Sequence, residues 1–193
     1  MKVSARSRAR QLAVQGLYEW HLSDNKIDDI ATQCLDAKRG KNLDEPYFEE
    51  LIYKVSSMAV DLNKLLVPFL SRDIEEIDPV ERAILQLGAY ELTQKIEIPY
   101  KVVINEAIEL AKTFGAEQSH KFVNGILDKV AEQSRATEFK ASSKPRAASI
   151  PEANSTVDTK NNPKISMKLK TKDRSVGKSK SQSKFQSKPK PNK

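Results

Sequence analysis

The sequence predicts an all-α protein, a compact bundle of about six to seven helices followed by a polar tail. Two observations support this fold class. Apolar residues recur every three to four positions through most of residues 4–134, which is the spacing of one helix face. No segment alternates apolar and polar residues with β-branched enrichment, so no sheet is expected. The connections between the periodic stretches are short, which favours a compact bundle.

The composition changes at about residue 136. Residues 1–135 contain 18 Lys and Arg against 22 Asp and Glu, a net charge of −4, whereas residues 136–193 contain 15 against 4, a net charge of +11. Isolated apolar residues in the second segment cannot offset the entropy cost of ordering it. We therefore expect a folded domain over residues 1–135 and a disordered Lys/Ser/Pro-rich tail over residues 136–193. The tail could add non-specific RNA affinity or be a solvated extension.

Several functional classes are disfavoured by the residue types present. A single cysteine, Cys34, cannot form an internal disulfide, and no apolar run of membrane-spanning length or signal peptide is visible, so a cytoplasmic protein is expected. Two histidines and one cysteine without close spacing do not predict a metal site, and no glycine-rich phosphate loop occurs. Ser119 and His120 are adjacent, so their side chains diverge. We expect no enzyme, metal or cofactor.

The first three predicted helices are marked by apolar stripes. The first covers residues 5–21, with Ser4 as its N-cap, and the second covers residues 27–35, with Asp24 as a candidate cap. The third is one continuous stripe of about six turns over residues 48–69.

The tetrapeptide that begins at Asp78 is a helix start signal. Asp78 suits the N-cap, Pro79 the first turn and Glu81 the third position of a capping box. The helix that follows, to about Thr93, is apolar on most sides and therefore belongs in the middle of the bundle. Two more helices are expected, over residues 99–114 with Gly115 after the end and from Ser119 to about residue 134.

The first helix carries an aromatic ring and cations away from its apolar side. At about 100° per residue, Tyr18 projects opposite the apolar positions, and Arg8 and Arg10 flank its face, which also holds Ser7, Gln11, Val14 and Gln15. Single-stranded RNA is bound by such pairs, because phosphates attract Arg and unstacked bases lie on aromatic rings. The alternative is a solvated basic face with Tyr18 packed on a neighbouring helix.

Acidic residues gather before the central helix, at Asp73, Glu75, Glu76, Asp78 and Glu81. They are explained either by the preference of helix N-termini for negative charge or by an acidic surface for a basic protein partner.

Lys121 and Phe122 open the last predicted helix. Phe122 lies at the edge of the apolar stripe, so it is either a peripheral core residue or a second stacking ring beside a cation.

Three segments resemble the NusB family of transcription antitermination factors: SARSRARQLAVQGLYEW, PFLSRDIEEIDPVERAIL and IPYKVVINEAIELAKTFGAEQSHKFVNGILDKVA. The resemblance covers about residues 1–133 and not the tail. It implies an all-α fold of two packed halves that binds the boxA element of ribosomal RNA transcripts together with the ribosomal protein NusE. It also implies entry into an antitermination complex on RNA polymerase, without a cofactor. Some relatives self-associate, so a homodimer is a further expectation.

The resemblance assigns roles to individual residues. Tyr18 and Phe122 match positions at or near the RNA and partner surface. Glu75 and Glu81 match acidic positions near the NusE interface. Ser7, inside the Arg-rich run, and Gln118, where an acidic residue is common, depart from the family pattern. The expected RNA-binding residues are Lys2, Arg6, Arg8, Arg10, Tyr18, Gln118, Lys121 and Phe122.

Two other functions remain open on the sequence. NusB-like domains also occur fused to RNA cytosine methyltransferases, but a catalytic α/β domain with a reactive cysteine is not seen here. A protein-only scaffold in ribosome assembly, with the RNA surface unused, is the second alternative.

Overall fold

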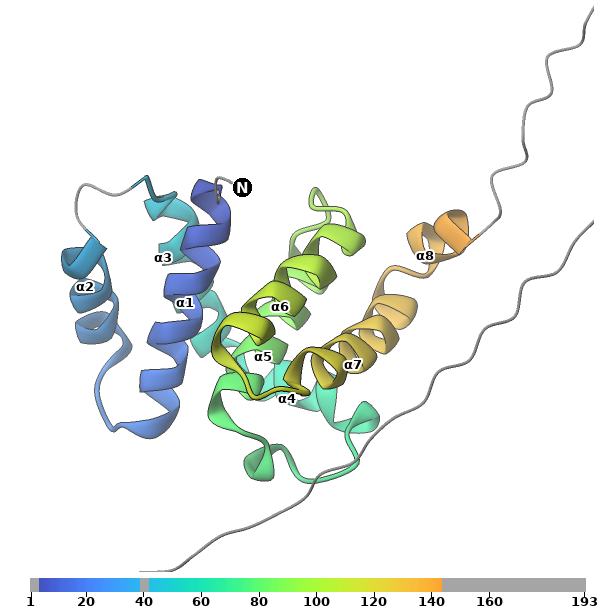
Figure 1. The fold of residues 1–193 in the computed structure, drawn as a ribbon, viewed down its shortest axis with the longest axis horizontal. Coiled ribbons are helices and arrows are strands. Elements are labelled where there is room, and N and C mark those ends of the chain that lie inside the picture. The colour runs from blue at the N-terminus through green and yellow to red at the C-terminus, as the bar shows by residue number, and fades with distance from the viewer. Residues whose placement is uncertain (1–3, 39–41, 144–193) are drawn as a thin grey trace, which may run out of the picture. The chain divides into compact units, whose positions relative to one another are not determined.

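The computed structural model describes residues 4–38 and 42–143, whose regular structure is helical throughout (Figure 1). No helix in these ranges has the length and apolar character to span a membrane. Residues 144–193, most of the predicted tail, lie outside the described residues. The elements are α1 (Ala5–Leu22), α2 (Ile27–Lys38), α3 (Glu45–Ser57), α4 (Ala59–Leu66), the 3₁₀ turns η1 (Val67–Phe69) and η2 (Ile74–Glu76), α5 (Pro79–Gln94), α6 (Tyr100–Phe114), α7 (Ser119–Ser134) and α8 (Ala136–Ser143).

Side-chain caps mark the first turns of α1 and α5. The Ser4 hydroxyl accepts a hydrogen bond from the backbone N–H of Ser7 at 3.0 Å, and Asp78 accepts one from Val80 at 2.9 Å. These caps confirm the predicted starts of α1 and α5. The prediction for α2 is wrong in its cap, because the helix begins at Ile27 and Asp24 lies too far before it.

The single helix predicted over residues 48–69 is two helices. The chain leaves helical geometry at Met58, where φ is −100° and ψ is 8°, between α3 and α4. The apolar spacing continues across the break, which is why the sequence pattern did not reveal it. The turn lets α3 pack on α1 while α4 packs on α5.

Helix α5 is the centre of the bundle, as predicted. Every residue from Glu81 to Leu92 is buried, and α1, α3, α4, α6 and α7 all pack against this helix. Figure 1 shows α1–α3 on one side and α4–α8 on the other, which agrees with two packed halves.

The chain stays helical beyond the predicted end of the domain. Arg135 is buried and donates hydrogen bonds to main-chain carbonyls at the end of α5, among them Leu92 at 2.6 Å. Glu138 accepts from the Tyr100 N–H at the start of α6, and the Phe139 ring lies 5.4 Å from the Tyr100 ring. The expectation of disorder from residue 136 is therefore wrong for residues 136–143, which form α8 and place Glu138 at the start of α6.

A buried ion pair joins α1 to the central helix. Arg10 is 3% exposed, and its Nε donates to both carboxylate oxygens of Glu91 at 3.0 and 3.1 Å. Its Nη2 donates to Glu91 at 2.8 Å and to the Tyr47 hydroxyl at 3.2 Å, and the Tyr47 hydroxyl donates to Glu91. Glu106 of α6 lies 3.5 Å from Nη1. Four helices thus meet at one guanidinium.

This network holds its charges inside the protein. Burial alone would lower the pKa of Arg10, but the hydrogen bond and negative charge of Glu91 raise it, so the guanidinium stays protonated. Burial and the Glu91 carboxylate raise the pKa of Tyr47, so its hydroxyl remains a donor.

The expectation that Arg10 faces solvent beside Tyr18 is wrong, because Arg10 is buried. The expectation that Val14 lies on the same outer face is also wrong, because Val14 is 1% exposed.

A second polar contact ties the end of α1 to α5 and α4. His21 Nε2 lies 2.9 Å from Gln86 Oε1, and the buried Gln86 donates to Asn63 at 2.8 Å. Burial, together with the positive charge of Arg82, lowers the pKa of His21 to about 4. The fold therefore holds this imidazole neutral.

Replacing Arg10 with Gln should lower the free energy of unfolding by about 3–5 kcal/mol, because Glu91 is left buried without its cation. The measurement is urea unfolding followed by circular dichroism. Arg8→Gln, two residues earlier, is the matched control and should change stability by less than about 0.5 kcal/mol. Equal stability of the two variants would contradict a structural role for Arg10.

The lowered pKa of His21 predicts a pH dependence of stability. The unfolded chain takes up a proton near the ordinary value of 6.5 and the folded chain only near 4, so the stabilisation is present above pH 6.5 and is lost as pH falls toward 4. Between neutral and acidic pH, wild type should lose on the order of 1–3 kcal/mol more than His21→Gln. Urea unfolding at both pH values measures the difference. His120→Gln should keep the wild-type loss, and a wild-type loss no larger than that of His21→Gln would refute the prediction.

Candidate RNA and protein interface

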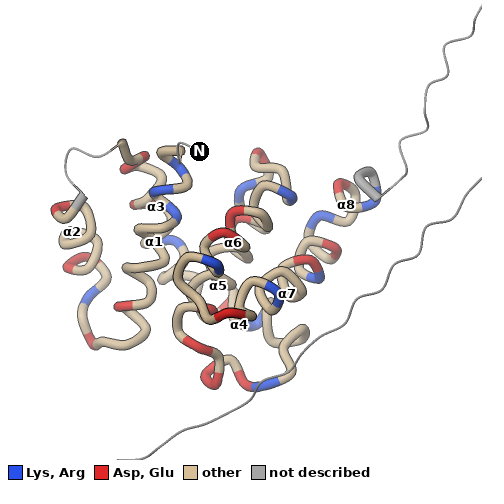
Figure 2. The backbone as a smooth tube through the Cα atoms, in the orientation of Figure 1, with Lys and Arg blue, Asp and Glu red and all other residues tan. Residues whose placement is uncertain are grey.

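Two arginines of the amino-terminal run remain at the surface. The Arg6 side chain is 57% exposed, with its Nε 3.3 Å from Asp44 and its guanidinium 5.1 Å from the centre of the Tyr47 ring. Arg8 Nη1 donates to the main-chain carbonyl of Asn42 at 2.9 Å. Figure 2 shows these cations along the first turns of α1. Lys2 lies outside the described residues.

The Ser7 hydroxyl is engaged within the protein. Its oxygen donates to Glu106 Oε1 at 2.9 Å, and the same carboxylate lies beside Arg10. Glu106 reaches the arginine run from α6, with a side chain 28% exposed. Ser7 donates a hydrogen bond to Glu106 without adding charge, and Arg10 is already paired with Glu91, so Glu106 remains a negative charge near the arginine run.

Tyr18 is 39% exposed and borders an apolar hollow of about 250 Å³. Val14 and Gln15 of α1, Val80 of α5 and Phe114 of α6 complete its lining. Tyr18 follows Arg6 by twelve residues, so the two side chains are separated by about 18 Å along the helix axis. The predicted surface thus has two parts on α1, a cationic end and an aromatic hollow.

The beginning of α7 adds polar and aromatic groups. Gln118 and Lys121 are exposed, whereas Phe122 is half-buried against the core. The guanidinium carbon of Arg72 lies 5.5 Å from the centre of the Phe122 ring. Phe122 is therefore both a peripheral core residue and one half of a cation–π pair. Sequence reasoning missed Arg72, because a single arginine in a polar turn carries no local signal.

The acidic residues before α5 divide into two groups. The Glu75 side chain is 73% exposed and pairs with Arg82, and Asp73, Glu76 and Asp78 are also exposed. Figure 2 shows this run of acidic residues in the segment that leads into α5. These four residues form the acidic turn, which is open to a partner.

Glu81 does not belong to this open surface. Its side chain is only 11% exposed, Oε1 accepts a hydrogen bond from the Ser119 hydroxyl at 2.6 Å, and Oε2 lies 3.5 Å from Arg72. The expectation of Glu81 as an open partner contact is wrong for this reason. Ser119 is the first residue of α7, where the sequence placed the start of this helix. A Cβ at Gly115 would lie 2.6 Å from the Ser119 Cβ, so glycine permits this close approach.

The serine and histidine that open α7 do not form a catalytic triad with Asp128. The Ser119 hydroxyl is bound to Glu81, and Asp128 accepts from Asn124 at 3.1 Å, so neither completes a triad with His120. Within residues 4–38 and 42–143, no group of three or more His, Cys, Asp or Glu side chains is placed to hold a metal ion.

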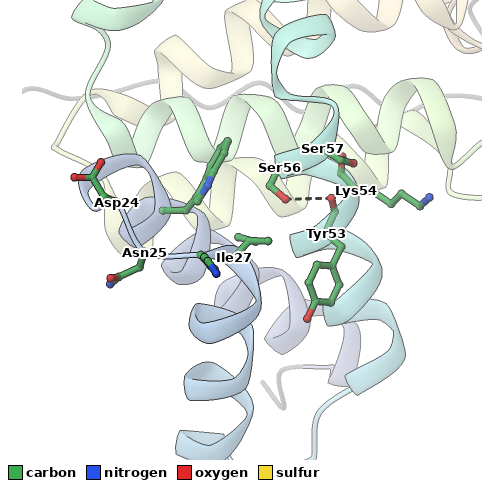
Figure 3. Close-up of a pocket in the computed structure, with 9 residues that line it drawn as sticks. Asp24, Asn25, Ile27, Tyr53, Lys54, Ser56 and Ser57 are labelled. Carbon is green, nitrogen blue, oxygen red and sulfur yellow. Dashed lines mark hydrogen bonds between the residues drawn. The ribbon is translucent and has the colours of Figure 1, made fainter.

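A second hollow, of about 580 Å³, lies where α1 and α3 end (Figure 3). Trp20, Ile27 and Tyr53 give it apolar walls, and its rim mixes Asp24 with Lys54. Trp20 and Tyr18 are two residues apart and so point to nearly opposite sides of α1. Because its rim charges are mixed and it lies away from Tyr18, this hollow is not part of the candidate interface.

The comparisons with known proteins agree with this arrangement. A family model described as the NusB family matches residues 7–132. The transcription antitermination proteins NusB of Yersinia pestis (strain Pestoides F) and Yersinia pseudotuberculosis (serotype O:1b, strain IP 31758) are each 56% identical over 131 residues, covering 68% of this chain and 95% of theirs.

Solved structures show the same fold. A T. maritima NusB structure is 31% identical, with a TM-score of 0.62, and the match covers 72% of this chain and 99% of that one. A crystal structure of antitermination factors NusB and NusE in complex with dsRNA is 27% identical, with a TM-score of 0.62, over 67% of this chain and 97% of that one. With a family model matching more than half of its length and relatives 56% identical over two thirds of it, the chain belongs to the NusB family of transcription antitermination proteins, which is not a family of enzymes.

Proposed function

We propose that this protein binds the boxA element of ribosomal RNA transcripts as a single strand, together with NusE, and thereby joins the complex on RNA polymerase that suppresses termination during ribosomal RNA synthesis. Family membership and a similar structure of NusB and NusE in complex with dsRNA support the RNA and NusE partners. The single observation that carries the proposal is the surface of α1, where Arg6 is exposed and Arg8 partly exposed at one end and Tyr18 is exposed at the other.

The RNA part of the proposal assigns phosphate contacts to the amino-terminal cations. Lys2, Arg6 and Arg8 would attract the backbone, while Lys121 and Gln118 would contact it near α7. Phe122 and Tyr18 offer ring faces for unstacked bases. Arg10 enters only by fixing α1 on α5, because its guanidinium is buried. Since residues 1–135 carry a net charge of −4, these local cations and not the overall charge must direct the RNA.

The protein part of the proposal assigns NusE to the hollow beside Tyr18 and to the acidic turn. The hollow offers an apolar anchor of about 250 Å³, and Glu75 stands exposed on the segment leading into α5. Apolar anchors carry most binding energy at protein interfaces, whereas exposed charges mainly speed association. A homodimer that covers Tyr18 would compete with NusE, so binding is measured over a range of protein concentrations.

Replacing Arg6 or Arg8 with Gln should weaken RNA binding and reduce the slope of log affinity against log salt by about 0.7 for each phosphate that is no longer neutralised. The measurement is fluorescence anisotropy with a labelled single-stranded boxA oligonucleotide, with and without NusE, over a salt series. Lys54→Gln, which removes one exposed cation at the far hollow, is the control and should leave the slope unchanged. A duplex of the same sequence tests the preference for a single strand. If the wild-type protein binds no RNA under any of these conditions, the RNA function is wrong and the protein-only scaffold in ribosome assembly is the remaining alternative.

Replacing Tyr18 with Ala should weaken NusE binding by about 2 kcal/mol, because it removes the aromatic wall of the hollow. Tyr53→Ala is the matched control, since Tyr53 is 37% exposed but borders the other hollow. Surface plasmon resonance measures the affinity. If Tyr18→Ala and Tyr53→Ala bind NusE equally, the hollow is not the NusE site.

Glu75→Gln should slow NusE association at low salt and have little effect at high salt. Surface plasmon resonance measures the association rate at both salt concentrations.

A further inference from the structure

Arg72 is an arginine held in place while much of it remains open to solvent. It lies in the turn between η1 and η2, and its side chain is 46% exposed. The guanidinium lies over the Phe122 ring, with 5.5 Å between the guanidinium carbon and the ring centre. Its Nη2 lies 3.5 Å from Glu81 Oε2. A long, flexible side chain is thus restrained by contacts from α5 and α7.

Glu81, which contacts Arg72, is itself held in place by a buried serine. Its Oε1 accepts a hydrogen bond from the Ser119 hydroxyl at 2.6 Å, and Ser119 is only 2% exposed. Gly115 leaves the space that brings Ser119 this close. One oxygen of the Glu81 carboxylate is therefore fixed by Ser119, and the other is directed toward Arg72. In this geometry Glu81 can hold the Arg72 guanidinium in position.

The exposed groups around Arg72 favour RNA over an acidic protein segment as the ligand. Lys121 and Gln118 are exposed at the start of α7, and its first turn contains no acidic residue, although the exposed Glu117 precedes the helix. The Arg72 guanidinium is held beside the Phe122 ring and is partly exposed, so it offers a flat, charged group on which an unstacked base can lie. Asp73 is the next residue and opposes a phosphate contact at Arg72 itself. Recognition there therefore depends on stacking more than on charge.

We infer that Arg72 is a further RNA-contact residue, which stacks on a base of the bound strand, and that Glu81 is a positioning residue that acts through Arg72. The inference rests on the proposed RNA function and extends it to residues for which sequence reasoning gave no role or a different one. Glu81 then contributes to RNA binding without touching RNA or NusE.

The first test varies Arg72 in the full chain, with the single-stranded boxA oligonucleotide as the probe and NusE present. Arg72→Ala should weaken RNA binding about ten-fold, in line with the loss of one stacked base. Arg72→Lys should recover little of this loss, because an ammonium group lacks the flat face of a guanidinium. Lys129→Ala, two turns beyond Phe122 on α7, removes the same charge and should change affinity less than about two-fold. Full recovery with Arg72→Lys, or an equal loss with Lys129→Ala, would overturn the stacking contact.

The second test is a double-mutant cycle between Glu81 and Arg72. Glu81→Gln keeps the size of the side chain and an acceptor for Ser119, but releases Arg72. It should weaken RNA binding about three-fold to five-fold in the wild-type background and have no effect in the Arg72→Ala background. Equal effects in both backgrounds would mean that Glu81 acts on the fold alone, which urea unfolding of the same variants detects.

The outcomes separate this inference from the proposed function. If wild type binds the oligonucleotide and the Arg72 variants bind it equally well, the function stands and the inference is wrong. If the Arg72 variants lose NusE binding but keep RNA binding, Arg72 is a protein contact and the inference is again wrong. If wild type binds no RNA at all, both fail.

Discussion

The buried ion pair between Arg10 and Glu91 is the constraint on which the surface of this protein depends. It joins α1 to the central helix, and through Tyr47 and Glu106 it also includes α3 and α6. Removing either charge would leave the other buried and uncompensated, a large cost in free energy. The pair therefore fixes the rotation of α1 about its own axis. That rotation decides that Arg6, Arg8 and Tyr18 are left at the surface while Val14 is covered.

The helices and their starts could be predicted from the sequence because they depend on local signals. Apolar spacing placed α1, α5, α6 and α7, and Ser4 and Asp78 cap as expected. The break at Met58 could not be predicted, because the apolar spacing continues across it and only packing on different neighbours separates α3 from α4. Helix α8 was missed for a related reason. Its residues bury little apolar surface, and its contact with the domain is made by Glu138 at the start of α6 and by Phe139 beside Tyr100, next to the buried Arg135 that precedes it.

The candidate site was predicted less well than the fold, because exposure of a charged residue is a tertiary property. Arg8 and Arg10 look alike in the sequence, both flanking the face of Tyr18, and only the second has a buried carboxylate opposite it. That carboxylate is eighty-one residues away. One sequence signal was available: Glu91 lies within the apolar central helix, and a carboxylate there requires a cation. Glu81 shows the same difficulty, since its place in a helix start signal gave no indication of Ser119 and Arg72 as its partners.

These internal pairings also explain how a domain of net negative charge can present a surface for RNA. Two carboxylates near the surface cations are paired with arginine: Asp44 lies beside Arg6, and Glu81 beside Arg72. In each pair the two charges offset each other, so the carboxylate repels a phosphate less strongly than it would alone. The partly exposed arginines Arg6 and Arg72 then combine restrained geometry with an accessible guanidinium face, which a free surface lysine does not provide. The proposed recognition of single-stranded RNA requires only such an arrangement, because positioned stacking and a few phosphate contacts can replace a large positive field.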